Sequence, residues 1–329
     1  MGYVLAVDGG QTTTLSVIAR LDGTILGAGL GGPANHLHEE GAKERCKKSI
    51  RDSLQGAMKE AGLTEVAFEH VALGMTGGTP LMRSLVWEVL QDYVDEDHFQ
   101  FEHDSVTAWA GGTGGKPGVV VIGGTGSVAL AVDSRGNRAR IGGWGYIMGD
   151  EGSAYQIALM ALSAATKGYE GRGPETILTK ALLEYFNVDD LWDVHAKIYS
   201  GDMDRSDIAR LSKLVGDGAN KGDAVCLTIL SHAAHELAQL VIAAAKKVDF
   251  SDVSPVISTA GGVWKAGLPI WKPFELEVTA AIENAQVVEP VYPPSIGALI
   301  LALKGAGVEI TTDVTDNIEK TRAIIERKK

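Results

Sequence analysis

Two short segments rich in glycine, threonine and serine have the composition of phosphate-binding turns. The segment DGGQTTT (8–14) follows the apolar run 3–7, and GGTGS (123–127) follows the apolar run 118–122. Glycine lets the backbone approach an anion and point N–H groups at it, and the neighbouring Thr and Ser side chains add hydroxyl donors. Both segments are therefore predicted to bind phosphate, and a pair of them could hold a polyphosphate from two sides.

The same two segments open two stretches that resemble each other. Residues 7–32 and 121–145 each predict a strand, a glycine–threonine turn, a second strand, a glycine-containing hairpin and a third strand, with an offset of about 114 residues from Gly9 to Gly123. Two copies of this length are too few and too long for a solenoid. The repeat instead predicts two homologous domains, each beginning with a hairpin that can bind phosphate.

The rest of the chain alternates between predicted strands and helices, which indicates an α/β fold. A long amphipathic helix is expected at 39–61 and a small-residue helix at 296–305, after Pro293-Pro294. Further expected strands are 70–73, 99–102, 253–259 and 274–278, and further expected helices are near 80–92, 152–167, most of 174–248, and 313–329.

Composition excludes several classes of function. The 329 residues carry a net charge of −12, which argues against a nucleic-acid partner, and 41 glycines with only 10 prolines do not indicate a linker. The two cysteines, Cys46 and Cys226, form no CxxC pair, which fits a reducing cytosol. No signal peptide and no membrane span is expected, so we predict a cytoplasmic protein without a membrane partner.

Two nucleotide-binding motifs are excluded as well. The P-loop sequence GxxxxGK[ST] does not occur. Residues 27–32 match GxGxxG, but the segment does not lead directly into a helix, and Asp52, about 20 residues further on, lies in a predicted helix instead of at a strand end. We therefore predict no dinucleotide site there.

The order of several longer motifs resembles one known family. DGGQTTT (8–14), PANH (33–36), HDS (103–105), GGTGS (123–127), GGWGYIMGDEGSAY (142–155) and STAGGV (258–263) occur in the order typical of the N-acetylglucosamine kinase and BadF-type ATPase family. This family is part of the actin-like sugar kinase superfamily. The resemblance implies two actin-like (ribonuclease H-like) domains with duplicated β-β-β-α-β-α cores and a cleft between them. We expect residues 1–115 and 116–329 to form these domains, with a helical insertion at about 152–250.

The resemblance also implies ATP and Mg²⁺ as cofactors. Asp8 would order the Mg²⁺ through water, because this ion keeps much of its hydration. Asp223 matches a family turn near the nucleotide, and Gly261 and Gly262 would lie under the adenosine. The residues implied for the phosphates are Gly9, Gly10, Gln11, Thr12, Thr13, Gly124 and Thr125.

Asp104 resembles the family's catalytic base. A carboxylate at a strand end can accept the proton of a sugar hydroxyl while the γ-phosphoryl group is transferred in line. An isolated Asp in this place is more simply a helix cap, so the assignment depends on the ordered motif set. The other positions that match sugar contacts are Asn35, Gly126, Ser127, Trp144, Gly145 and Asp150, with no fixed role for His36 and His38.

The expected activity is ATP-dependent phosphorylation of the 6-hydroxyl of an amino sugar, with N-acetylglucosamine first and glucosamine or N-acetylmuramic acid as alternatives. The resemblance further implies a homodimer. An alternative of another class is an ATPase that activates a reductase and holds an iron–sulfur cluster between two subunits. Cys46 and Cys226 of two chains could supply four ligands for such a cluster, although both lie in predicted amphipathic helices, where a buried thiol is the ordinary outcome.

Overall fold

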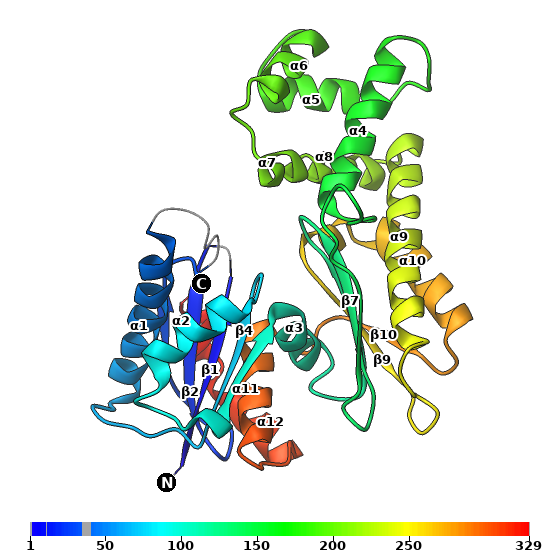
Figure 1. Ribbon diagram of the computed structural model, residues 1–329. Coiled ribbons are helices and arrows are strands. Elements are labelled where there is room, and N and C mark those ends of the chain that lie inside the picture. The colour runs from blue at the N-terminus through cyan, green and yellow to red at the C-terminus, as the bar shows by residue number, and fades with distance from the viewer. Residues whose placement is uncertain (1, 11, 35–40, 329) are drawn as a thin grey trace. The chain divides into compact units, whose positions relative to one another are not determined.

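The structure is a computed structural model that describes residues 2–10, 12–34 and 41–328. The predicted site residues Gln11 and Asn35, together with His36 and His38, lie outside the described residues. The chain divides into two compact units, unit 1 with Met1–Lys116 and Pro290–Lys329, and unit 2 with Pro117–Glu289 (Figure 1).

Unit 1 is built on a five-stranded sheet with the order β3-β2-β1-β4-β5. The central strand β1 is antiparallel to β2 and parallel to β4. Residues 4–7 of β1 are fully buried, which explains their unbroken apolar run. The strands are β1 (Tyr3–Gly9), β2 (Thr14–Arg20), β3 (Ile25–Gly31), β4 (His70–Met75) and β5 (Phe99–His103).

Glycines on β3 bring the helix α1 (Ala42–Ala61) close to the sheet. Gly27, Gly29 and Gly31 occupy every second position and so share one face of the strand. A Cβ atom on these glycines would lie 2.4, 2.1 and 2.0 Å from backbone oxygens of α1. The GxGxxG pattern at 27–32 therefore serves the packing of a helix on a strand.

The C-terminal helices belong to unit 1. Helix α11 (Pro294–Gly305) packs on β1, β4 and α3 (Asp104–Gly112). The contact is close because both helices carry glycine where they meet: a Cβ on Gly297 would lie 1.9 Å from the carbonyl oxygen of Thr107, and one on Gly111 would lie 2.7 Å from that of Pro293. The remaining helices of this unit are α2 (Pro80–Leu90), α12 (Thr312–Thr321), α13 (Ala323–Glu326) and the 3₁₀ helix η1 (Glu96–His98).

This arrangement corrects one sequence-based boundary. We expected residues 116–329 to form a single second domain, but the segment from Pro290 onward returns to unit 1. The physical reason is the apolar, small-residue surface of α11, which is almost entirely buried against the first sheet and α3. Such tertiary packing leaves no mark in the local sequence pattern.

Unit 2 repeats the sheet of unit 1. Its strand order, β8-β7-β6-β9-β10, has the same pairing directions, with β6 antiparallel to β7 and parallel to β9. The predicted duplication of an α/β core is thereby confirmed. The strands are β6 (Gly118–Gly123), β7 (Ser127–Val132), β8 (Arg138–Gly142), β9 (Val256–Ala260) and β10 (Gln286–Val288).

Helices fill the sequence between β8 and β9, as the predicted helical segments indicated, and of these α9 packs along the second sheet (Figure 1). The strand expected at 274–278 is wrong, because these residues lie inside α10 (Leu268–Ala281). Ile270, Phe274 and Val278 are fully buried at a spacing of four residues, which is helical periodicity. The other helices are α4 (Ala154–Tyr169), α5 (Leu178–Phe186), α6 (Leu191–Tyr199), α7 (Arg205–Arg210), α8 (Ser212–Asn220), α9 (Ala224–Ala245) and η2 (Gly262–Ala266).

Helix α9 is the one helix in the described part of the chain that is long and apolar enough to cross a membrane, a feature that the sequence-based expectations did not include. Half of its most apolar window is buried inside the protein. Its buried residues belong to the core of unit 2, where α9 packs on α8, α10 and the strands β6–β8. These contacts are those of a core helix.

Candidate active site

The first predicted phosphate turn closes the hairpin between β1 and β2. The Gly10 N–H donates a hydrogen bond to the Thr13 carbonyl oxygen at 2.8 Å, and the side chains of Thr12 and Thr13 are exposed. At Gly9 there is no room for a side chain, because a Cβ would lie 2.2 Å from the sulfur of Met75. The turn therefore presents the hydroxyl groups of Thr12 and Thr13 to solvent.

Asp8 lies at the end of β1, where it pairs with Leu15 on one side and Gly74 on the other. Its partly exposed carboxylate is directly adjacent to the glycine turn. A carboxylate oxygen is the kind of ligand that Mg²⁺ prefers, and a single carboxylate leaves room for water and phosphate oxygens. The residues present therefore fit a magnesium ion bound together with a nucleotide.

Asp104 is the first residue of α3 and lies at the end of β5. Its Oδ2 accepts a hydrogen bond from the Thr76 hydroxyl at 2.9 Å, and its Oδ1 lies 2.7 Å from Nδ1 of His103. Two acceptors would repel each other at that distance, so Nδ1 carries the proton and donates it to the carboxylate; in this state Nδ1 does not accept the Ser105 N–H, which lies 3.2 Å away. Burial alone would raise the pKa of Asp104, but the contacts with His103 and Thr76 outweigh it and lower the pKa below its ordinary value.

Thr76 connects this carboxylate to the first phosphate turn. Its backbone N–H donates to the carbonyl oxygen of Gly9 at 2.9 Å while its hydroxyl holds Asp104. The structure thus brings the predicted base and the predicted phosphate turn of unit 1 together through one residue. The side chain of Asp104 is about one-third exposed, so it can still meet a ligand.

The second predicted phosphate turn closes the hairpin between β6 and β7 in the same way as the first. The Gly124 N–H donates to the Gly126 carbonyl oxygen at 2.9 Å, which matches the bond from Gly10 to Thr13. Gly261 follows β9 with φ at +96°, and a Cβ there would lie 2.4 Å from the Gly123 carbonyl oxygen. The exposed Gly261 and Gly262 therefore lie against the second phosphate turn.

Asp150 also packs on this second turn. Its Oδ1 accepts the Ser127 N–H at 3.1 Å, and its Oδ2 forms an ion pair with Nη2 of Arg205. A Cβ on Gly126 would lie 2.8 Å from Oδ1, so glycine is needed there. The carboxylate is almost completely buried and is held from two sides, which favours a role in shaping the site beside any contact with a sugar.

The loop before Asp150 carries the other predicted sugar contacts of unit 2. Trp144 is 72% exposed, and Gly145 has a φ of +82°. The neighbouring Ile147 and Met148 are exposed as well. The loop therefore offers an indole face and further apolar surface to a ligand.

The carboxylate of Asp223 is held by hydrogen bonds that stabilise the fold. Its carboxylate caps α9 by accepting the Cys226 N–H at 2.8 Å, and it also binds the Ile177 N–H and the Thr176 hydroxyl. These bonds fasten the segment before α5 to the start of α9. Because its acceptor sites are occupied in this way, Asp223 is the weakest of the predicted nucleotide contacts.

Three residues of the site have no counterpart in the sequence-based prediction. Thr76 lies in a glycine-rich turn after β4, a position that could have drawn attention to it. His103 is part of the HDS motif, but the sequence-based prediction assigned a role only to Asp104 of that motif. Arg205 lies 55 residues from Asp150 in a predicted helical region, and no local signal indicates the ion pair.

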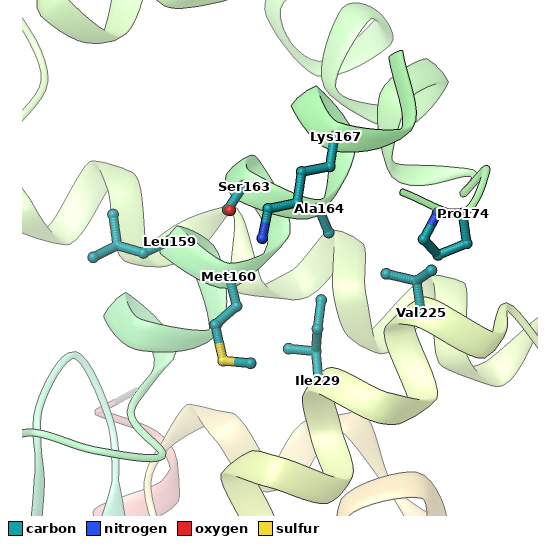
Figure 2. Close-up of a pocket in the computed structure, with 8 residues that line it drawn as sticks. All are labelled: Leu159, Met160, Ser163, Ala164, Lys167, Pro174, Val225 and Ile229. Carbon is teal, nitrogen blue, oxygen red and sulfur yellow. The ribbon is translucent and has the colours of Figure 1, made fainter. Parts of the chain in front are cut away.

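A separate cavity of about 400 Å³ lies between α4 and α9 (Figure 2). Leu159, Met160 and Ile229 give it an apolar lining, and Lys167 lies at its edge. None of the predicted site residues that the structure describes lines it. The cavity is therefore distinct from the candidate active site.

The duplicated sheets, each with a glycine-rich turn after its first strand, define two actin-like domains of the type found in ATPases and sugar kinases. The chain belongs to the BadF/BadG/BcrA/BcrD ATPase family, whose family model matches residues 5–302. This confirms the family resemblance drawn from the ordered motifs.

Several individual proteins are similar over almost the whole chain. An N-acetylmuramic acid/N-acetylglucosamine kinase of Clostridium acetobutylicum is 29% identical, covering 92% of this chain and 98% of that protein. An N-acetyl-D-glucosamine kinase of Dictyostelium discoideum is 30% identical, with coverage of 91% and 97%. The solved structure of a candidate N-acetylglucosamine kinase from Chromobacterium violaceum has a TM-score of 0.70 at 25% identity, with coverage of 92% and 99%.

Proposed function

We propose that this protein is an ATP-dependent kinase that phosphorylates the 6-hydroxyl of an amino sugar, with N-acetylglucosamine as the substrate. The observation that carries the proposal is the environment of Asp104. Hydrogen bonds from Thr76 and His103 fix the orientation of its carboxylate, and their effect on its pKa keeps it ionised at neutral pH. An oriented, ionised carboxylate beside a phosphate-binding turn suits a general base.

In the proposed reaction the sugar O6 attacks the γ-phosphorus of ATP as its proton passes to the Asp104 carboxylate. The bond between the γ-phosphorus and the bridging oxygen breaks, and ADP leaves. A sugar hydroxyl is a weak nucleophile, so accepting its proton in the transition state contributes to the rate. The turns at Gly9–Thr13 and Gly124–Thr125 would donate backbone and hydroxyl hydrogen bonds to the phosphate oxygens. Mg²⁺, ordered by Asp8, would offset the negative charge of the phosphates.

The identity of the sugar is supported by the names of the relatives. One is named for N-acetylglucosamine and another for both N-acetylmuramic acid and N-acetylglucosamine. N-acetylmuramic acid carries an additional carboxylate. The guanidinium of Arg205 is already paired with Asp150, whereas that of Arg140 lies beside Gly143 in the loop with Trp144. Because both of these relatives are named for N-acetylglucosamine, we retain this sugar as the first candidate and keep N-acetylmuramic acid and glucosamine as alternatives.

The alternative of another class, a reductase-activating ATPase with a shared iron–sulfur cluster, finds no support in the positions of the cysteines. Cys46 is fully buried in the core of unit 1, and Cys226 is fully buried in the core of unit 2. A cluster shared by two subunits needs thiolates at a surface. We therefore favour the kinase, and the proposal includes the cytoplasmic homodimer that the family resemblance implies.

The test is a coupled ATP assay with N-acetylglucosamine, N-acetylmuramic acid and glucosamine, with the phosphorylated position assigned by NMR. Asp104→Asn is expected to reduce kcat by about 10²- to 10⁴-fold while leaving the affinity for an ATP analogue unchanged. Glu102→Gln, on β5 two residues before Asp104, is the control and should retain activity. Near-normal turnover of Asp104→Asn would remove the base assignment, and ATP hydrolysis without any sugar product would remove the kinase proposal.

A further inference from the structure

Arg205 contacts both Asp150 and the second phosphate turn, which Asp150 also contacts directly through the Ser127 N–H. Arg205 is the first residue of α7, and a capping box between Asp204 and Asp207 fixes the backbone there, with bonds of 2.8 and 3.1 Å. Helix α7 packs against α4, which follows the loop that contains Asp150. The side chain of Arg205 is one-third exposed, so most of it lies inside the protein.

One nitrogen of this guanidinium has two partners. Nη2 donates to Oδ2 of Asp150 and, at 3.1 Å, to the carbonyl oxygen of Thr125. Thr125 is the central residue of the second phosphate turn, and Asp150 is the predicted sugar contact. A single polar group therefore spans the predicted nucleotide side and the predicted sugar side of unit 2.

Two aromatic rings enclose the same guanidinium. Its carbon Cζ lies 5.1 Å from the ring centroid of Tyr146 and 5.6 Å from that of Tyr155, within the range of cation–π contacts. Tyr146 belongs to the loop with Trp144, and Tyr155 lies in the first turn of α4. Arg205 thus contacts the loop through Tyr146, while Trp144, Ile147 and Met148 of the same loop remain exposed.

Asp150 depends on this cation. Its carboxylate is nearly fully buried, and its backbone has a φ of +64°, in the left-handed region that non-glycine residues seldom adopt. A buried carboxylate needs a compensating charge and hydrogen bonds. Arg205 supplies the charge, and the Ser127 N–H supplies a further hydrogen bond.

We propose that Arg205 is a positioning residue that makes the binding of sugar and of nucleotide to unit 2 cooperative. A sugar hydroxyl bound at Asp150 orders the ion pair, and through Nη2 it orders the Thr125 carbonyl and the phosphate turn. The nucleotide then meets an arranged turn and loses less conformational freedom on binding. The linkage is reciprocal, so nucleotide also favours sugar. This inference rests on the proposed function, because it takes an amino sugar and ATP as the two ligands.

The test is calorimetry with a non-hydrolysable ATP analogue, with and without saturating N-acetylglucosamine. In the unchanged protein the sugar should tighten analogue binding by roughly 5-fold or more. Arg205→Met should bring this ratio to about 1, as expected when the coupling is removed. Arg205→Lys keeps a charge for Asp150 but lacks the planar guanidinium that lies against the rings of Tyr146 and Tyr155, so it should fold and still lose most of the coupling. Arg210→Met, on the same helix and paired with Asp207 at the surface, is the matched control.

A merely structural role for Arg205 predicts a different result. Arg205→Met would then lower the unfolding temperature but leave the ratio of the two affinities unchanged, and this outcome would overturn the inference. Arg205→Met leaves the buried carboxylate of Asp150 without its partner. The double variant Arg205→Met/Asp150→Asn removes that charge, so it should fold better than Arg205→Met and should also show no coupling. If the protein without substitutions phosphorylates the sugar but the sugar does not tighten binding of the ATP analogue, only the inference about Arg205 is rejected. A protein that phosphorylates no amino sugar rejects the proposed function as well.

Discussion

The hydroxyl of Thr76 donates a hydrogen bond of 2.9 Å to Oδ2 of Asp104, and the backbone N–H of the same Thr76 donates to the carbonyl oxygen of Gly9 at 2.9 Å. Thr76 lies one residue beyond β4, between the strand that ends at Gly9 and the strand that leads to Asp104. The sheet order therefore sets the separation between the proposed base and the first phosphate turn. Loss of either hydrogen bond of Thr76 would let the proposed base move relative to the phosphates.

Thr76→Val should reduce kcat/KM for the sugar by about 10- to 100-fold, since a hydrogen bond to a charged group contributes roughly 1.5–3 kcal/mol. Valine keeps the shape of threonine but cannot donate, so Asp104 loses one of its two orienting contacts. Thr76→Ser keeps the hydroxyl and should restore most of the activity. Steady-state kinetics of both variants checks this, and equal losses in the two would assign the effect to packing.

The pH dependence of the reaction should report the contacts of Asp104. A base must be ionised, so kcat/KM falls on the acid side as Asp104 of the free enzyme becomes protonated. Its pKa is lowered because the contacts with His103 and Thr76 outweigh the effect of burial, which acts in the opposite direction. His103→Gln removes the first of these contacts, the pKa of Asp104 rises, and the acid limb moves to higher pH. His98→Gln, the same substitution at an exposed histidine of unit 1, serves as control; an unshifted limb in His103→Gln contradicts the assignment.

The glycine turns were predictable because their signal is local. A strand, a turn of fixed composition and a second strand are adjacent in sequence, and the repeat from Gly9 to Gly123 strengthened each prediction. The structure extends this correspondence, because Thr76 and Gly261 follow equivalent strands and lie against the carbonyl oxygens of Gly9 and Gly123. The contacts of Thr76 and Gly261 with the two turns could not be read from the sequence, because β4 and β9 lie far along the chain from the turns.

The wrong and missing sequence-based predictions also have physical causes. Phe274–Val278 alternates apolar and polar residues over a short stretch, which fits a strand until Ile270 is included and the spacing of four appears. The membership of α11 in unit 1 depends on the contact of Gly297 with α3, and the role of Arg205 depends on an ion pair across 55 residues. Such contacts form only when the chain folds, and they leave no periodic pattern in the sequence.

Gly297→Ala should destabilise unit 1 by about 1–3 kcal/mol, the usual cost of overpacking. The added methyl group would lie 1.9 Å from the Thr107 carbonyl oxygen, so α11 would have to move away from α3. Gly216→Ala is the matched control, since this helical glycine has its nearest neighbour at 3.3 Å and alanine favours the helix. Urea unfolding of both variants measures the difference, and equal stability would show that the two helices pack less closely than described.

The two cysteines provide a test that separates the kinase from the iron–sulfur alternative. Burial raises the pKa of Cys46 to about 11, and burial together with Asp223 raises that of Cys226 to about 12. Since the thiolate is the reactive form and the metal ligand, neither cysteine should react with a thiol reagent in the native protein. Both should react after unfolding in urea.

Cys46→Ala and Cys226→Ala should accordingly keep the kinase activity, because neither side chain is part of the proposed site. Anaerobically purified protein should contain no iron and show no visible absorption. Iron bound in the unchanged protein and lost in either variant would contradict the kinase assignment and support the reductase-activating ATPase. Rapid thiol modification of the native protein without iron would instead mean that one of the two cores opens more readily than its burial implies.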